Sequence, residues 1–219
     1  MSPVLLADLT HHVVTHHVVG AVGHLSTAEA PPGSPDGPIR KVAALAGYVA
    51  FGIMAMTISW GVLTTTGFAR RWVDRQTMIA GHMVLAIIFL TFGWVHGMVY
   101  IFQTQEQFGI AKVFVPFIQG GEIEVALGIV GLELATAVAI SLMIQRRLSY
   151  RTWHFVHWLA YPAFAFSLAH TITTSPEVRA LGLVGITVAA ISLVVIALAV
   201  LRVLPGAPVT HARIAPVEP

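Results

Sequence analysis

Cysteine is absent from the 219 residues of the chain. Without a thiol the protein can form no disulfide, hold no iron–sulfur cluster and attach no cofactor through sulfur of cysteine. Charge is also scarce, because Asp, Glu, Lys and Arg make up only 10% of the chain, whereas about 25% is usual in soluble domains. Only Lys41 and Lys112 are lysines. This composition argues against a soluble globular fold.

Apolar residues dominate instead: they make up 56% of the chain, and the mean hydropathy is +0.80. The formal net charge is only +2, so we expect no nucleic-acid partner. The sequence predicts an all-α membrane protein, a bundle of about five transmembrane helices in a lipid bilayer. The expected spans are 43–66, 80–100, 124–144, 153–173 and 180–203.

These spans define one membrane domain over residues 40–203. Residues 1–39 are a histidine-rich segment with a linker rich in proline and glycine, and residues 204–219 are a tail that we expect to be mobile. The loop at 103–121 contains the apolar patch VFVPF. We expect this patch to form a short amphipathic or re-entrant piece.

The basic residues predict how the chain is oriented. One side of a five-span chain collects eight of them, namely Arg70, Arg71, Arg75, Arg146, Arg147, Arg151, Arg202 and Arg213. The other side collects four, namely Arg40, Lys41, Lys112 and Arg179. Because basic residues favour the cytoplasmic side, we expect a multi-pass plasma-membrane protein with its N-terminus outside and its C-terminus in the cytoplasm.

The N-terminal segment lacks the basic start and the long apolar core of a signal peptide. It contains LTHHVVTHHVV, in which His12 and His16 are four residues apart. On a helix these two side chains share a face and could bind Zn, Cu or Fe outside the membrane. The alternative is an interfacial or partner-packed segment with valine and leucine on one side and histidine on the other.

Two of the expected spans carry two histidines each, His82 with His96 and His157 with His170. Imidazoles are costly in hydrocarbon, so they mark a functional site. Their separations of fourteen and thirteen residues correspond to about 21 and 20 Å along a helix. The two spans run in the same direction, which places His82 opposite His157. His96 is then opposite His170, and because facing helices can hold haem between them, the pattern predicts two stacked haems.

The angular positions of these histidines around their helix axes fit two stacked haems less well than their heights do. Fourteen residues at about 100° each return His96 to the face of His82, whereas thirteen residues leave a mismatch of about 140° in the other span. That span therefore needs a bend or a local change of winding. Pro162 lies between its two histidines and can supply the bend, because proline removes a helix hydrogen bond.

Other interpretations of these side chains are open. Each histidine could pack between helices and bond to Ser, Thr or a backbone carbonyl. His154 is a rival of His157, although it lies nearer the interface, where it would meet water or a haem propionate. Met83 and Met98 could bind haem iron, but methionine at helical spacing more often fills space in a core.

Residues 76–178 resemble the ferric reductase-like transmembrane domain, the haem-bearing part shared by ferric reductases, NADPH oxidases and bacterial relatives. The resemblance rests on the spacings H-x13-H and H-x12-H, and on the segments VFVPF, VALGIVGLELATAV and QRRLSYRTWHFVHWLAYPAFAFSLAHT. It implies a cytochrome b of the bacterial cell membrane. It also implies axial ligands to two haems b, which are His82, His96, His157 and His170.

Beyond the fifth span the sequence shows no flavin or nicotinamide domain and no Gly-rich phosphate loop. We therefore expect electrons from a partner reductase, a membrane quinol or another redox subunit of a membrane complex. Arg75 and Arg151, at the cytoplasmic ends of the histidine spans, could neutralise haem propionates or serve orientation alone. Glu133 lies in mid-span, where a carboxylate is costly. It could relay protons, touch a quinone, or bond to a neighbouring helix in its protonated form.

Three hypotheses follow from the sequence. The leading one is a di-haem electron-transfer subunit of an oxidoreductase, fed by a partner on one side and emptied by an acceptor on the other. No side chain is assigned a catalytic role in it. The second makes the chain the haem-bearing, quinone-reactive anchor of a larger dehydrogenase complex. The third has no haem and uses the histidines for a divalent metal.

Overall fold

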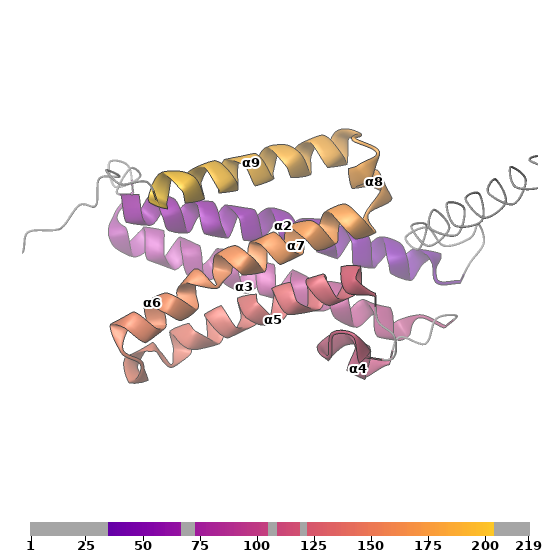
Figure 1. The fold of residues 1–219 in the computed structure, drawn as a ribbon, viewed down its shortest axis with the longest axis horizontal. Helices are drawn as coiled ribbons and strands as arrows, with labels where there is room; N and C mark the ends of the chain where they lie inside the picture. The colour runs from indigo at the N-terminus through magenta and orange to yellow at the C-terminus, as the bar shows by residue number, and fades with distance from the viewer. Residues whose placement is uncertain (1–34, 67–72, 105–108, 119–121, 204–219) are drawn as a thin grey trace, which may run out of the picture.

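A computed structural model describes residues 35–66, 73–104, 109–118 and 122–203 of the protein. All regular structure in these ranges is helical (Figure 1), which confirms the all-α prediction. The segments 1–34 and 204–219 lie outside the described residues, and with them His12 and His16.

Four helices in the described part are long and apolar enough to cross a membrane. They are α2 (Gly37–Thr66), α3 (Arg75–Val99), α5 (Ile123–Met143) and α9 (Leu183–Val203). The sequence predicted about five such helices, one more than the described part contains. The expected span at 153–173 is divided between two shorter helices, α6 (Tyr150–Trp158) and α7 (Ala160–Thr174).

The break between α6 and α7 lies at Leu159, three residues before Pro162. Because Pro162 has no N–H, the carbonyl of Trp158 lacks its helical donor. Leu159 N–H donates to Val156 O at 3.0 Å, a tighter turn, and Ala163 N–H then donates to Leu159 O at 3.0 Å. The two helices follow each other across the bundle (Figure 1), so residues 150–174 still connect its two ends.

The helices pack as antiparallel pairs. The most extensive contacts in the described part are those of α2 with α3 and of α5 with α7, and α9 lies along α2 (Figure 1). Phe51 of α2 and Phe164 of α7 join the two pairs, with stacked rings whose centroids are 5.5 Å apart. Ala163, beside Phe164, is fully buried. This contact fixes the spacing between the helix pairs.

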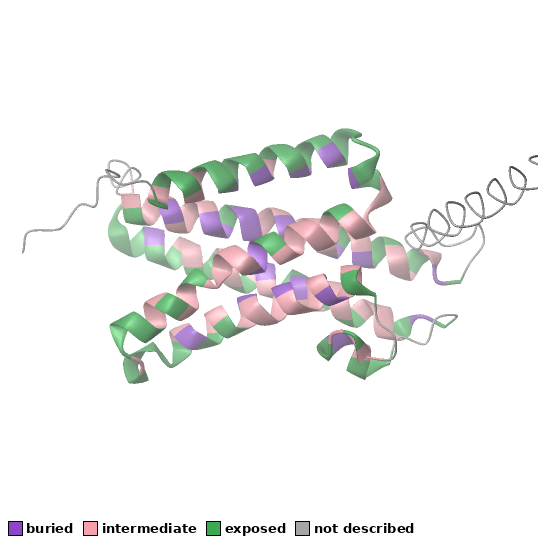
Figure 2. Ribbon diagram, viewed as in Figure 1, coloured by how far each residue is buried: buried purple, intermediate pink, exposed green. Residues whose placement is uncertain are grey.

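The outer faces of the bundle are apolar. Buried residues gather where helices face one another, and α9 is exposed along most of its length (Figure 2). On α9, Leu183 is 83% exposed and Leu193 is 66% exposed. Surfaces of this kind are stable when lipid covers them. The apolar helices and their exposed faces identify a membrane protein.

Side-chain caps start α3 and α6, two of the three helices that carry these histidines. At the start of α3, Asp74 accepts a hydrogen bond from Thr77 N–H at 3.0 Å and a second from Thr77 Oγ1 at 2.6 Å. At the start of α6, Ser149 Oγ accepts from Thr152 N–H at 3.1 Å. A cap satisfies a backbone donor that the first turn leaves open. Both caps therefore fix where α3 and α6 begin.

The short helices lie at the ends of the bundle: η2 (Tyr100–Phe102), α4 (Ile110–Phe114), η4 (Gln145–Arg147) and α8 (Pro176–Arg179). The helix α4 lies in the loop at 103–121. Its Phe114 ring lies 5.2 Å from the ring of Trp94 on α3. The expected short piece therefore packs against the C-terminal part of α3.

The two ends of the bundle differ in their basic residues. The end where α3 and α6 begin and α2, α5 and α9 finish (Figure 1) carries Arg75, Arg146, Arg147, Arg151 and Arg202. We call it the arginine end. The far end carries Arg40, Lys41, Lys112 and Arg179, whereas Arg70, Arg71 and Arg213 lie outside the described residues. Which end faces the cytoplasm stays a prediction.

Candidate functional site: two histidine pairs

The four histidines of the spans lie in two pairs. The ring centroids of His82 on α3 and His157 on α6 are 6.1 Å apart, with 58° between the ring planes. Those of His96 on α3 and His170 on α7 are 6.0 Å apart, with 74° between the planes. We call these the arginine-end pair and the far pair. The residues meet in the combinations that their spacing suggested, and their role as haem ligands stays a prediction.

Helix α2 holds both histidines of α3. His82 Nδ1 lies 3.1 Å from Thr57 O, and His96 Nδ1 lies 2.7 Å from Ala43 O. A carbonyl oxygen can only accept, so Nδ1 must carry the proton in both rings. The neutral imidazole then keeps its lone pair on Nε2, the nitrogen available to a metal.

Helix α5 holds His170 of α7 in the same way. His170 Nδ1 lies 2.7 Å from Glu124 O, which again assigns the proton to Nδ1. Three of the four imidazoles are therefore oriented by a backbone carbonyl of the helix packed alongside their own. The Glu124 carboxylate plays no part in this contact.

His157 has a different environment. Its ring stacks on Trp153, one turn earlier in α6, with centroids 5.3 Å apart and an angle of 26°. Trp153 Nε1 is buried and has no hydrogen-bond partner among the described residues. Near this pair, Arg202 of α9 lies over the ring of Trp158, 5.9 Å from its centroid. An aromatic ring thus lies against the one histidine of the four that has no described contact with a carbonyl.

His154, the rival of His157, makes other contacts. Its ring stacks with Tyr150 at 5.6 Å, and its Nε2 lies 3.4 Å from Trp158 Nε1. The ring that faces His82 is that of His157.

Three glycines make room for the carbonyl-bound rings, and the sequence interpretation missed them. A Cβ atom built on Gly47 would lie 2.8 Å from His96 Nδ1, and one on Gly128 would lie 2.8 Å from His170 Nδ1. On Gly61 it would lie 3.1 Å from His82 Cε1. Gly47 and Gly61 are fourteen residues apart, as are His82 and His96. This shared spacing is the sequence signal that could have found them.

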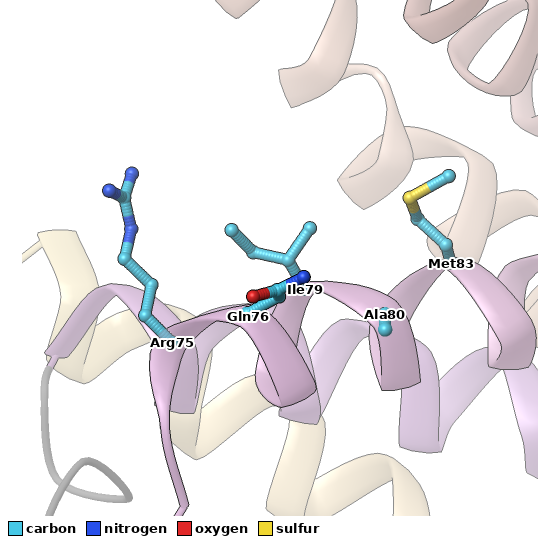
Figure 3. A pocket seen from close by; sticks show the side chains of 5 residues that line it. All are labelled: Arg75, Gln76, Ile79, Ala80 and Met83. Atoms are coloured by element: carbon cyan, nitrogen blue, oxygen red, sulfur yellow. The ribbon is translucent and has the colours of Figure 1, made fainter.

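An open groove of about 380 Å³ runs along α3 near the arginine-end pair. Arg75, Ile79 and Met83 project to the same side of the helix and line it, together with Gln76 and Ala80 (Figure 3). Arg151 is exposed in the first turn of α6 and does not line this groove.

Glu133 is partly buried at the middle of α5, five residues after Gly128. It therefore lies between the levels of the two pairs, about 7.5 Å along the axis from Gly128. Within the described ranges, no group of three or more His, Asp or Glu side chains is placed to hold a metal ion. Each pair offers two imidazoles.

Comparison with known protein families identifies the family of the chain. Residues 46–168 match the family described as ferric reductase like transmembrane component, which is more than half of the 219 residues. The matched segment includes most of α2 and three of the four histidines, and it ends two residues before His170. Neither a curated protein nor a solved structure matched the chain significantly. The chain belongs to the family of ferric reductase-like transmembrane components.

Proposed function

We propose that the protein is a di-haem b-type subunit that passes electrons across a membrane, with one haem held by each histidine pair. The family supports a membrane electron-transfer role. The observation that carries the proposal is the separation of the rings, 6.1 Å in one pair and 6.0 Å in the other. An imidazole nitrogen binds a transition metal at about 2 Å, so two imidazoles on opposite sides of one metal hold their centroids about 6 Å apart.

The surroundings of the pairs fit such a group. The carbonyls of Thr57, Ala43 and Glu124 leave Nε2 of three imidazoles free to bind. A haem also carries carboxylates, which need hydrogen-bond donors when they are buried. Near the arginine-end pair the buried N–H of Trp153 has no partner in the described part. Near the far end, the side chain of Gln103 is 6% exposed and its amide bonds to no described residue.

A bound haem b would take up and release one electron at a time. The protein's part is to hold and orient it. The two imidazoles of each pair would hold the haem iron between them, which would favour electron transfer over binding of oxygen. Arg75 and Arg151, near the arginine end, would neutralise propionates of the nearer haem. The buried Phe51 and Phe164 keep the helix pairs at a fixed spacing between the two levels.

The chain would act with partners. A reductase, a quinol or another redox subunit would deliver electrons at the arginine end, which we place in the bacterial cytoplasm with the C-terminus. An acceptor would take them outside, where the N-terminal histidines, His12 and His16 among them, could gather ferric or cupric ions. In this role the protein is the electron-transfer subunit of an oxidoreductase.

The test is electron transfer across vesicles. The protein is expressed with haem supplied, reconstituted into lipid vesicles that contain ferricyanide, and given dithionite outside. We expect a reduced b-type spectrum and bleaching of the trapped ferricyanide. Vesicles with His96→Ala should bleach no faster than empty vesicles, whereas His154→Ala should match the wild type. A wild-type protein without b-type absorption bands would overturn the proposal and favour the non-haem metal hypothesis.

A second function, the quinone-reactive anchor, is favoured by the groove on α3. Its walls are apolar at Ile79, Ala80 and Met83, and it carries Arg75 and Gln76 at one end, a combination suited to a quinone ring with polar oxygens. If quinol is the donor, it should reduce the haem, and Met83→Trp should slow that reduction without changing haem content. Glu133→Gln should slow it as well if Glu133 takes the proton of the quinol.

A further inference from the structure

Each carbonyl that binds a histidine lies four residues before a glycine of the same helix. Ala43 precedes Gly47, and Thr57 precedes Gly61, both on α2. The same step connects Glu124 to Gly128 on α5. In an α-helix the carbonyl of residue i accepts the N–H of residue i+4. The side chain at i+4 therefore covers the carbonyl that a neighbouring helix would have to reach.

We propose that Gly47, Gly61 and Gly128 are positioning residues, each of which uncovers a carbonyl so that it can bind Nδ1–H of a histidine on the next helix. The carbonyl oxygen has two lone pairs, so it can keep its helical donor and accept the imidazole as well. A Cβ atom at Gly47 or Gly128 would lie 2.8 Å from Nδ1 of the ring. No alanine fits there unless the ring moves. This inference rests on the proposed function, because it gives the rings their role toward haem.

This arrangement, a glycine four residues after a carbonyl that binds a histidine, occurs three times on two helices that are far apart in the sequence. Coincidental packing is therefore a weak explanation. On α2 the two carbonyls and the two glycines are each fourteen residues apart, matching the interval between His82 and His96. Gly52, on the same helix, has nothing within 4 Å of an added Cβ atom. Glycine is thus needed at specific levels of α2 and not along its whole length.

The fourth level lacks this arrangement. Thirteen residues beyond Glu124 and Gly128, the interval between His157 and His170, α5 carries Ala137 and Ser141. Position 141 therefore has a side chain, and its Oγ donates a hydrogen bond of 2.7 Å to the carbonyl of Val138. At this level His157 stacks on Trp153 instead. The glycine and the carbonyl-bound imidazole are present together or absent together.

The consequence for the cofactor follows from the proton on Nδ1. A carbonyl that accepts this proton fixes the tautomer and the direction of the ring, and it makes Nε2 a stronger donor to the metal. Loss of such an outer partner typically weakens metal binding by roughly 10–100-fold. A tilted ring would also point Nε2 away from its partner across the pair.

The experiment compares Gly47→Ala, Gly61→Ala and Gly128→Ala with the matched control Gly52→Ala in the purified full chain. Alanine has a higher helix propensity than glycine, so a role in helix formation alone predicts no loss in any variant. We expect each of the three to lose about half of the bound haem, or to hold it roughly 10–100-fold more weakly in titrations with added haemin. Gly52→Ala should behave as the wild type.

If all three variants keep the haem content of the wild type, the inference is overturned, while the proposed function stands as long as the wild type holds two haems. Absence of haem from the wild type would overturn the proposed function instead. If a variant fails to accumulate, ¹⁵N-histidine NMR of the reduced wild type tests whether the carbonyls bind the imidazoles. It should show a hydrogen-bonded proton on Nδ1 of His82, His96 and His170. A deprotonated Nδ1 on these rings would contradict the role of the carbonyls.

Discussion

The two histidine pairs are built from the same side chains but are supported differently. In the far pair, both Nδ1 atoms lie 2.7 Å from a backbone carbonyl, and neither histidine lies next to a helix break. In the arginine-end pair, His82 is 3.1 Å from its carbonyl, while His157 stacks on Trp153 two residues before the helix break. The far pair therefore depends on backbone positions, and the arginine-end pair depends partly on an aromatic side chain.

Under the proposed function, this difference between the pairs should affect the reduction potentials of the two haems. A hydrogen bond from Nδ1–H to a carbonyl makes the imidazole a stronger electron donor, which favours the oxidised iron. The arginine-end pair has this bond on His82 and, in the described contacts, an aromatic ring on His157. It also lies near the charge of Arg202, which favours the reduced iron. The two haems should therefore differ in potential.

The largest effect that separates the pairs is removal of one ligand. We expect His96→Ala and His170→Ala to lose one haem and keep the other, and His82→Ala and His157→Ala to lose the complementary one. The measurement is haem per polypeptide together with the reduced α band of what is left. Identical residual spectra after His96→Ala and His82→Ala would remove the distinction between the pairs.

A substitution between the two levels should loosen the contact of α5 with α7. A Cβ atom on Gly131 of α5 would lie 2.8 Å from Ser167 Oγ and 3.2 Å from Ala163 O, a backbone atom of α7 that cannot move aside. Gly131→Ala should therefore separate α5 from α7 and destabilise the fold by about 1–3 kcal/mol, the usual effect of overpacking. Thermal unfolding in detergent measures it.

The control for this variant is Gly93→Ala. Its added Cβ atom would lie 2.9 Å from Leu132 Cδ1, the tip of a flexible side chain, so the loss of stability should be smaller. A midpoint for Gly131→Ala equal to that of Gly93→Ala would show that the contact of α5 with α7 is looser than described.

The potentials of the two haems give a smaller effect. The haem left in His96→Ala, at the arginine end, should titrate at a higher potential than the haem left in His82→Ala. We expect a difference of roughly 30–60 mV, about a tenfold change or less in the one-electron equilibrium constant. Spectroscopic redox titration of the two variants measures it. A lower potential at the arginine end would show that the hydrogen bonds to the carbonyls are not the dominant influence on the difference in potential.

The cap of α3 gives the smallest effect. Two hydrogen bonds from Thr77 lower the pKa of the Asp74 carboxyl below its ordinary value of 3.8. A lowered pKa stabilises the fold above the unfolded pKa, and this contribution is lost as the pH falls through the folded pKa. Asp74→Asn should lower the unfolding midpoint slightly at pH 7 and not at all below the folded pKa. A pH-independent difference would mean that the charge is not what matters.

Much of the fold could be predicted because lipid imposes it. Apolar runs long enough to cross a bilayer are visible in any sequence, and the predicted end at Thr66 of the first span agrees with the end of α2. The division of the span at 153–173 was harder to place. Pro162 indicated a bend, but the helix ends at Trp158, because the proline removes the donor to the carbonyl four residues before it.

The candidate site could be predicted as far as its histidines. Their spacing gives both the levels and the pairs, since a helix converts residue number into height. The glycines and the carbonyls of Ala43, Thr57 and Glu124 could not be found in this way. A carbonyl belongs to every residue, so only the packing of α2 on α3 and of α5 on α7 shows which three are used. The stacking of His157 on Trp153 depends in the same way on tertiary structure.

The central claim is that each histidine pair holds one haem, and the most direct test is the haem-to-polypeptide ratio of the purified wild-type chain. Haem is measured by its pyridine complex and polypeptide by amino-acid analysis after expression with excess haem precursor. The account predicts two haems b per chain, both with six-coordinate, low-spin spectra. A ratio of one or less, or a haem that binds carbon monoxide readily because an axial position is open, would contradict it.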